Sequence, residues 1–105
     1  MPADIFSALS DPTRRIIVEI LADHDGSPAS DIHMQFHISP QAVSQHLKIL
    51  RDADLVHVEK KAQQRIYRIN TDAMIELEEW SYNMRLRWSS RLDAKEAVME
   101  TEIES

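Results

Sequence analysis

Residues 39–51 read Ser-Pro-Gln-Ala-Val-Ser-Gln-His-Leu-Lys-Ile-Leu-Arg, which is the pattern of a helix with one apolar and one polar face. Ser39 is placed to cap this helix, and Pro40 at its first position loses no backbone hydrogen bond. The apolar residues at helical spacing are Val43, Leu47 and Leu50. The other face carries Gln41, Ser44, Gln45 and Lys48. The stretch therefore predicts a helix that packs on one side and presents hydrogen-bonding groups on the other.

Three helices are expected before this one. The apolar residues of a short first helix are Ile5, Phe6 and Leu9. Ser-Asp-Pro at residues 10–12 indicates the start of a second helix, which ends before Asp-Gly at residues 25–26, the only glycine in the chain. Ser-Pro at residues 27–28 repeats the cap-and-proline pattern and predicts a short third helix, with Ile32 and Phe36 toward the core.

The pattern changes from helical to alternating after the decisive stretch. Residues 56–58 and 66–69 alternate apolar and polar side chains on either side of a turn at residues 61–64, which predicts a β-hairpin. Asn70 or Thr71 is then placed to cap a long final helix. Its apolar positions are Met74, Leu77, Trp80, Met84, Trp88 and Leu92. The fold class is therefore mainly α with a small β-hairpin.

The composition bounds what the protein can be. A chain of 105 residues fits one domain, placed at residues 1–96, followed by an acidic tail at residues 97–105 that we expect to be flexible. The absence of cysteine excludes disulfides and thiolate-bound zinc or iron–sulfur centres. No apolar run approaches the roughly 18 residues of a membrane span. Residues 1–4 lack the pattern of a signal peptide, so we expect a cytoplasmic protein without membrane contacts.

The net charge is −6, which on its face disfavours binding to nucleic acid. The charge is unevenly distributed, however. Residues 38–69 carry six cationic and three acidic side chains, whereas residues 1–37 and residues 93–105 each sum to −4. The basic third of the chain coincides with the decisive helix and the hairpin. Such a segment is either a solvated basic patch or a surface that attracts a polyanion.

The order of elements favours the second interpretation. Two helices joined by a short turn, the second with a polar face, form the helix-turn-helix unit that inserts a recognition helix into the major groove of DNA. A hairpin directly after this unit is a wing, placed to contact the adjacent backbone or the minor groove. We therefore expect a winged helix-turn-helix protein that binds double-stranded DNA, with its recognition helix at residues 39–52 and its wing at residues 57–68.

Three blocks of sequence resemble ArsR-type winged-helix transcriptional repressors. Residues 9–21, Leu-Ser-Asp-Pro-Thr-Arg-Arg-Ile-Ile-Val-Glu-Ile-Leu, look like the opening of that family. Residues 39–51 look like its recognition helix, and residues 65–69, Arg-Ile-Tyr-Arg-Ile, match the return strand of its wing. The resemblance spans about residues 5–92. It implies a homodimer, paired through the first and last helices, that binds a palindromic operator and represses transcription.

Two positions depart from the family pattern, which usually has glycine between the two helices and again after the recognition helix. The chain has His37 and Asp54 there. Both residue types enter the left-handed region more readily than most non-glycine residues, so we expect left-handed turns at both positions.

The expected DNA contacts fall on the recognition helix and the wing. Ser44, Gln45 and His46 are candidates for base edges or phosphates, against the alternative of an ordinary polar helix face. Cationic side chains of both elements would neutralise phosphates. The full set is Ser39, Gln41, Ser44, Gln45, His46, Lys48, Lys60, Lys61, Gln63, Gln64 and Arg65. Arg51 is left open, because it could equally pair with a carboxylate within the fold.

No other chemistry is indicated by the sequence. The five histidines are scattered over different elements, so we expect no metal site and no cofactor. No arrangement of nucleophile, base and acid indicates an enzyme. A small-molecule effector is left unknown. The alternative to a repressor is a winged-helix module that binds a protein partner instead of an operator.

Apolar side chains of the first and last helices form the expected dimer interface. A stripe this apolar overfills the core of a 105-residue chain, and aromatic residues and methionine are enriched in interface cores. The alternative, a ligand-binding box of aromatic residues, is less usual for this spacing. The set is Ile5, Phe6, Leu9, Leu77, Trp80, Met84, Trp88 and Leu92.

Overall fold

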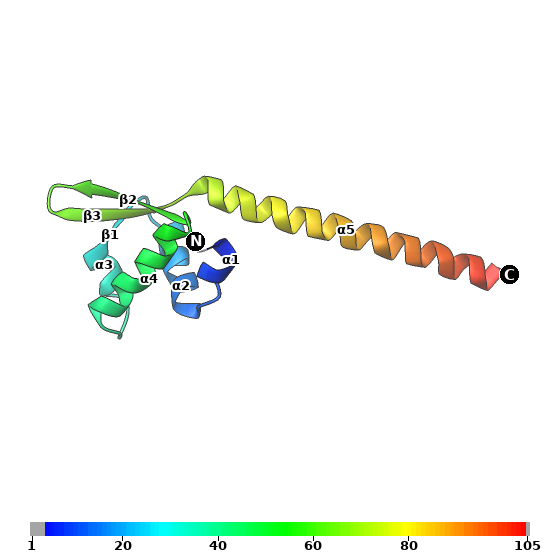
Figure 1. Cartoon of the computed structure of the whole chain (residues 1–105), viewed down its shortest axis with the longest axis horizontal. Helices are drawn as coiled ribbons and strands as arrows, with labels where there is room; N and C mark the ends of the chain where they lie inside the picture. Colours follow the sequence, from blue (N-terminus) through cyan, green and yellow to red (C-terminus); the bar gives the residue numbers. More distant parts are fainter. Residues whose placement is uncertain (1–3, 105) are drawn as a thin grey trace. The chain divides into compact units, whose positions relative to one another are not determined.

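The computed structural model describes residues 4–104, with side chains over residues 4–94, and it comprises two compact units that divide after Met74. The helices are α1 (Ile5–Ala8), α2 (Pro12–Ala22), α3 (Ala29–His33), α4 (Pro40–Asp52) and α5 (Thr71–Glu104). The strands are β1 (Ser27–Pro28), β2 (Val56–Lys61) and β3 (Gln64–Ile69). Helices α1 to α4 lie on one side of the β2–β3 hairpin, whose tip extends beyond them (Figure 1). The predicted fold class, mainly helical with a small hairpin, is confirmed.

Side-chain caps define the starts of α2 and α4, as predicted. Oδ1 of Asp11 accepts hydrogen bonds from the backbone N–H groups of Thr13 at 2.8 Å and Arg14 at 3.2 Å. Oγ of Ser39 accepts one from the N–H of Ala42 at 3.1 Å. Desolvation acts to raise the pKa of Asp11, but the backbone hydrogen bonds from Arg14 and Thr13, together with the electrostatic attraction of the nearby His46 and Arg14 side chains, outweigh it and hold the pKa below its usual value. These caps satisfy N–H groups that have no partner within the helix.

The prediction that Ser27 and Pro28 cap a helix is wrong. They form the short strand β1, in which Ser27 lies opposite Tyr67 of β3 in antiparallel register. Helix α3 begins at Ala29 without a side-chain cap. Ser27 is only 6% exposed, and pairing with β3 gives its backbone partners that a cap would not. A long-range strand pairing has therefore overridden a local helix-start signal.

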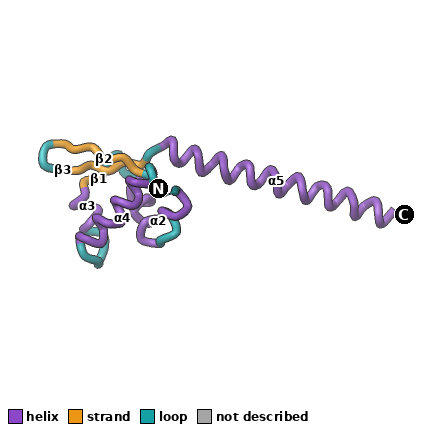
Figure 2. The backbone as a smooth tube through the Cα atoms, in the orientation of Figure 1, coloured by secondary structure: helices purple, strands orange, loops and turns teal. Residues whose placement is uncertain are grey.

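The sheet has three antiparallel strands in the order β1–β3–β2, one strand more than the sequence predicts (Figure 2). The turn predicted at residues 61–64 is confirmed, because β2 ends at Lys61 and β3 begins at Gln64. Ala62 in this turn has a φ of 53°, a left-handed conformation that the sequence does not predict for alanine. The hairpin is thus closed by only two residues.

Gly26 is required where the chain enters β1. Its φ is 91°, and a Cβ at this position would lie 2.9 Å from Cγ2 of Ile66 and 3.0 Å from Nη2 of Arg68. Both the backbone conformation and the close approach to β3 therefore favour glycine. The single glycine ends no helix directly. It lets the chain turn against the central strand.

Of the two left-handed turns expected from the family pattern, one is confirmed. Asp54 has a φ of 58°, and its carbonyl accepts a hydrogen bond from Nδ2 of Asn70 at 2.7 Å. The expectation for His37 is wrong, because among the described residues the non-glycine positive φ angles belong to Asp54 and Ala62. The six residues 34–39 between α3 and α4 give the chain enough length to turn without a left-handed residue.

The core of the first unit takes side chains from α2, α3, α4 and the hairpin. The largest fully buried side chains are Ile17, Ile32, Val43, Leu47, Leu50, Leu55 and Val56. Three of the seven come from α4, so the apolar face of that helix is fully committed to the core. Its opposite face is left to solvent.

Asn70 joins the hairpin to α5. Its Oδ1 accepts a hydrogen bond from the N–H of Asp72 at 3.2 Å, so the predicted cap at this position is confirmed. The backbone of α5 is helical to Glu104. The flexible tail expected at residues 97–105 stays a prediction, because its side chains lie outside the described residues. No helix in the described part of the chain is long and apolar enough to cross a membrane.

We predict that Gly26→Ala lowers the free energy of unfolding by at least about 1–2 kcal/mol, since the new Cβ enters a left-handed conformation and meets β3. Ala62→Gly is the matched control of opposite sign. It relieves a left-handed alanine and should raise stability by about 0.5 kcal/mol after the entropy of glycine is counted. Urea unfolding of both variants measures the two effects. A Gly26→Ala protein with the same free energy of unfolding as the wild-type protein would contradict the requirement for glycine at this position.

Candidate nucleic-acid interface

The exposed face of α4 carries the polar residues predicted for it. Gln41, Ser44, Gln45 and Lys48 are all exposed, and they lie opposite the three buried apolar side chains of the helix. Ser39 is also exposed, but its hydroxyl already accepts a hydrogen bond as the helix cap. The hydroxyl retains its own O–H and one lone pair for a further partner. The face therefore offers amide and hydroxyl groups near the N-terminal half of α4 and a cation after them.

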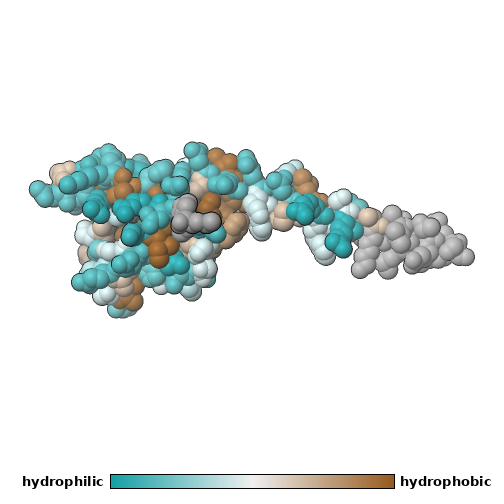
Figure 3. Space-filling view, viewed as in Figure 1, coloured by the Kyte–Doolittle hydropathy of each residue, from teal (hydrophilic) through white to brown (hydrophobic). Residues whose placement is uncertain are grey.

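The two faces of the hairpin differ in charge. Lys60 lies directly opposite Arg65, and like charges in this position repel each other unless an anion lies between them. On the other face, Nη1 of Arg68 donates to Glu59 at 2.8 Å, and its Nε donates to Asp25 at 3.4 Å. One face thus carries unpaired cations, whereas the arginine on the other is neutralised. Lys61, Gln63 and Gln64 are exposed at the tip, where the surface is mostly hydrophilic (Figure 3).

A shallow hollow of about 280 Å³ lies between α4 and β3. The polar side chains that line it are Ser44, Gln45, Lys48, Arg51, Arg65 and Tyr67. No carboxylate lines the hollow, and within residues 4–94 no carboxylate forms an ion pair with its three cations. Tyr67, only 5% exposed, closes it from β3. In a protein of net charge −6, this concentration of unpaired positive charge indicates a site for an anion.

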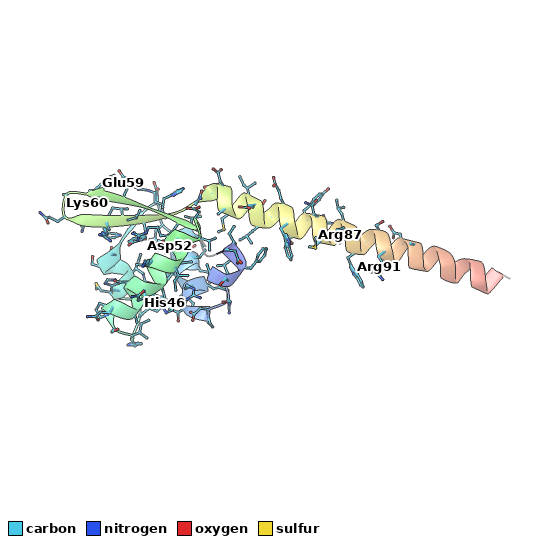
Figure 4. All side chains as sticks on the ribbon, viewed as in Figure 1. His46, Asp52, Glu59, Lys60, Arg87 and Arg91 are labelled. Carbon is cyan, nitrogen blue, oxygen red and sulfur yellow. The ribbon has the colours of Figure 1, made fainter. Side chains whose placement is uncertain are left out.

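His46 occupies the flank of α4 and is half-buried (Figure 4). Its Nδ1 lies 3.1 Å from Nη1 of Arg14, which belongs to α2. The side chain is therefore held from within the fold, unlike the exposed side chains of Ser44 and Gln45. Among the polar residues predicted on α4, His46 is the one that another helix contacts through a side-chain hydrogen bond within residues 4–94, and this contact restrains its position.

Comparisons with known proteins agree with this geometry. A family model described as a helix-turn-helix domain matches residues 9–59. The chain is 38% identical to the transcriptional repressor SdpR of Bacillus subtilis over 80 residues, which is 76% of this chain and 88% of that protein. It is 42% identical over 67 residues to the uncharacterized HTH-type transcriptional regulator YdfF of the same organism, covering 64% of this chain but only 30% of that longer protein.

Among solved structures, an ArsR-like transcriptional regulator from Rhodococcus sp. RHA1 superposes with a TM-score of 0.79 at 28% identity, covering 90% of this chain and 88% of that one. The chain belongs to the ArsR family. It is a winged helix-turn-helix, DNA-binding transcriptional regulator.

This ArsR-family regulator gathers its candidate DNA contacts from two elements. One group of predicted contacts lies on α4, and the other lies on the β2–β3 hairpin that follows it in the chain. The hollow brings Ser44, Gln45 and Lys48 together with Arg65. The other predicted hairpin contacts do not line it: Lys60 lies directly opposite Arg65, and Lys61, Gln63 and Gln64 are at the tip.

Two polar residues of the hollow, Arg51 and Tyr67, are absent from the predicted DNA contacts. For Arg51 the sequence leaves open a contact or an internal ion pair, and within the described residues no carboxylate pairs with it. Its position seven residues, about two turns, after Ser44 and three residues after Lys48 places it on the same side of the helix as Ser44, which is a usable signal. Tyr67 gives no such signal, because strand alternation alone does not distinguish a core tyrosine from one that lines a surface hollow.

The apolar residues predicted for a dimer interface divide between the two units. In the first unit, Ile5 and Leu9 are half-buried and Phe6 is 51% exposed. On α5, Leu77 and Met84 are half-buried, whereas the larger aromatic side chains and Leu92 are exposed. Trp88 is 61% exposed. A second set, Ile75, Tyr82 and Leu86, is exposed on another side of the same helix.

The described residues contain no group of three or more histidine, aspartate or glutamate side chains that could hold a metal ion. The expectation that this regulator uses no metal and no cofactor remains a prediction, since the side chains after residue 94 are outside the description.

We predict that Arg51→Gln weakens binding to a mixed-sequence DNA duplex about tenfold at low salt, because it removes an unpaired cation from the hollow. Arg68→Gln changes the net charge equally but removes a cation already paired with Glu59 and Asp25, so it should weaken binding less than about twofold. Fluorescence anisotropy measures both. Equal losses would show that only overall charge matters and not the hollow.

Proposed function

We propose that the regulator is a homodimeric repressor that binds a palindromic operator. In this proposal, recognition helix 39–52 enters the major groove, and wing 57–68 contacts the backbone or the minor groove. The observation that carries the proposal is the continuity of the exposed polar face of α4 with the cationic hollow between α4 and β3. A helix with such a face fits the groove, and the adjacent cations fit the phosphates that border it.

We assign the base contacts to the exposed residues in the N-terminal half of α4. The amide of glutamine can form a bidentate pair with adenine, and the hydroxyl of serine can donate to or accept from any base edge. Gln41, Ser44 and Gln45 meet this requirement, because each is exposed and none has a hydrogen-bonding partner for its side chain within residues 4–94. Sequence specificity would therefore rest on these three.

We assign the phosphate contacts to the cationic side chains of the hollow and the wing. Lys48, Arg51 and Arg65 converge on the hollow, and Lys60 and Lys61 extend the positive charge along the hairpin. The repulsion between Lys60 and Arg65 is relieved when a phosphate lies beside them. Gln63 and Gln64 at the tip would add neutral hydrogen bonds to backbone or minor-groove acceptors.

Dimerisation follows from the apolar side chains of α5. Leu77, Trp80, Met84, Trp88 and Leu92 recur at intervals of three or four residues and so form one stripe. Exposed stripes of this kind mark interaction surfaces, and a second copy of the chain offers an identical stripe. Ile5, Phe6 and Leu9 of α1 would complete the interface. A two-fold dimer matches the two half-sites of a palindrome.

Repression is the regulatory direction we assign, and the relative from Bacillus subtilis that is named a repressor supports it. A dimer that occupies a promoter prevents transcription by exclusion and needs neither catalysis nor a cofactor. Neither an effector nor a metal is part of this proposal. A cytoplasmic location follows from a role on the chromosome.

We predict a division of roles between the recognition helix and the wing. Ser44→Ala and Gln45→Ala should lower affinity for DNA selected from a random pool by about 1–3 kcal/mol while leaving mixed-sequence DNA nearly unaffected. Lys61→Ala and Arg65→Ala should weaken both about equally, and each should reduce the salt slope by about one, because one phosphate fewer is neutralised. Affinity measured across a salt series separates the two classes. A uniform response of all four variants contradicts this division.

The same experiment tests the alternative function. If the random pool yields no enriched sequence, the operator-binding proposal fails, and the alternative of a winged-helix module that binds a protein partner without an operator is favoured.

We predict that Trp88→Ala raises the dissociation constant of the dimer at least about thirtyfold, because a large aromatic side chain at an interface core is a typical hot spot. Leu86→Ala is the control, since Leu86 is 44% exposed on another side of α5. Sedimentation at low protein concentration measures both. An unchanged profile for Trp88→Ala would rule out this helix face as the interface.

A further inference from the structure

Arg14 connects three helices through one guanidinium group. Its Nε donates to the carbonyl of Ala8 at 2.6 Å, and its Nη2 donates to the carbonyl of Ser7 at 3.5 Å, both at the end of α1. Its Nη1 lies 3.1 Å from Nδ1 of His46 on α4. Arg14 itself is in the first turn of α2, where its N–H is bound by the cap Asp11. The guanidinium is thus held in place before it reaches the histidine.

The chemistry of the pair decides which nitrogen of His46 carries the proton. A guanidinium is always protonated in proteins and has only donors. Nδ1 of His46 must therefore accept with its lone pair, which requires a neutral imidazole protonated at Nε2. An imidazole without such a partner populates both tautomers. Arg14 removes this freedom from His46.

The other ring nitrogen remains available. Within residues 4–94, the only buried side-chain nitrogen or oxygen that lacks a hydrogen-bonding partner is Nε2 of His33, so the unpaired Nε2 of His46 reaches solvent. Successive helix residues are about 100° apart, which places His46 beside Gln45 at the edge of the exposed face of α4. A group at this edge approaches the border of the groove instead of its floor.

We propose that Arg14 is a positioning residue that fixes His46 as a hydrogen-bond donor to a phosphate oxygen at the edge of the groove. The inference rests on the proposed function, because it assumes that α4 lies in the major groove. It adds a specific role for His46 and a role for a residue of α2 that the exposed surface does not reveal.

A fixed donor is suited to this partner. Every phosphate oxygen is an acceptor, so an imidazole that presents the lone pair of Nε2 would be repelled by it, and one that presents N–H would bind it. Fixing the tautomer in the free protein removes the unproductive form before DNA binds, which is preorganisation of the contact. Ser7 and Ala8 hold Arg14, so the contact also depends on the end of α1.

A second histidine supplies an internal reference of opposite tautomer. Nδ1 of His24 lies 2.7 Å from the carbonyl oxygen of Ile20. A carbonyl only accepts, so Nδ1 of His24 must carry the proton. The structure therefore assigns His24 and His46 to different tautomers in the same protein.

The tautomers are measured directly by long-range proton–nitrogen NMR of the full chain labelled with ¹⁵N-histidine. The spectrum is recorded without DNA at a pH of about 8, above the ordinary histidine pKa of about 6.5. We expect the Nε2–H form for His46, assigned by its disappearance in His46→Asn, and the Nδ1–H form for His24. Arg14→Gln should convert the His46 signal to a mixture and leave His24 unchanged.

An Nδ1–H or mixed signal from His46 in the wild-type protein would overturn the inference. This result is independent of DNA binding, so it separates a failure of the inference from a failure of the proposed function. It also holds if Arg14→Gln fails to fold, because the wild-type spectrum alone decides the tautomer.

The phosphate contact is tested with two substitutions of His46. Asparagine retains an acceptor for Arg14 near the position of Nδ1 but has no donor near Nε2, whereas the longer glutamine places an amide N–H near Nε2. We expect His46→Asn to weaken binding about tenfold and His46→Gln less than about threefold. The probes are the selected DNA and a mixed-sequence duplex of roughly 30 base pairs, about three helical turns.

Similar losses for His46→Asn on both DNAs support a phosphate contact. A loss confined to the selected DNA would overturn the phosphate assignment in favour of a base contact. Equal affinities of the asparagine and glutamine variants would overturn the role of His46 as a donor.

Discussion

The burial of one face of α4 is the constraint on which the rest of the structure depends. Val43, Leu47 and Leu50 are fully or almost fully buried, and each contributes about 2 kcal/mol by leaving water. Their sum is comparable to the whole stability of a small domain, which is about 5–15 kcal/mol. The helix therefore cannot rotate about its axis without losing the core. The groups opposite these residues are therefore directed outward, so packing sets the orientation of the polar face that we propose binds DNA.

The parts of the fold that depend on local chemistry were predictable from the sequence. The caps at Asp11 and Ser39 and the hairpin turn are decided by residues within a few positions of each other, whereas the left-handed Asp54 was expected from the family resemblance. The prediction for Ser27 and Pro28 is wrong because β3, some forty residues later in the chain, competes for the same backbone. The hollow was only partly predictable for a similar reason. Its cations come from two elements whose side-by-side placement no local pattern contains.

The charge distribution was also only partly predictable from the sequence. The sequence identifies residues 38–69 as basic, but it does not show which cations are already neutralised. The two faces of the hairpin make that distinction. Arg68 is paired with Glu59 and Asp25, whereas Arg65, on the opposite face, has no carboxylate partner among the described residues. An acidic protein can therefore present a concentrated positive site, because most of its carboxylates lie in other segments of the chain and none lines the hollow.

The two hydrogen bonds of Asn70 restrict which side chains this fold can accept at position 70. Its Nδ2 donates to the carbonyl of Asp54, and its Oδ1 accepts from the N–H of Asp72. Aspartate would cap α5 equally well but would set a carboxylate against that carbonyl, and serine has too short a reach for both partners. The two bonds together demand a short side chain with a donor and an acceptor at its end. Asparagine alone meets this demand, so we expect substitutions of Asn70 to cost more stability than its partly exposed location implies.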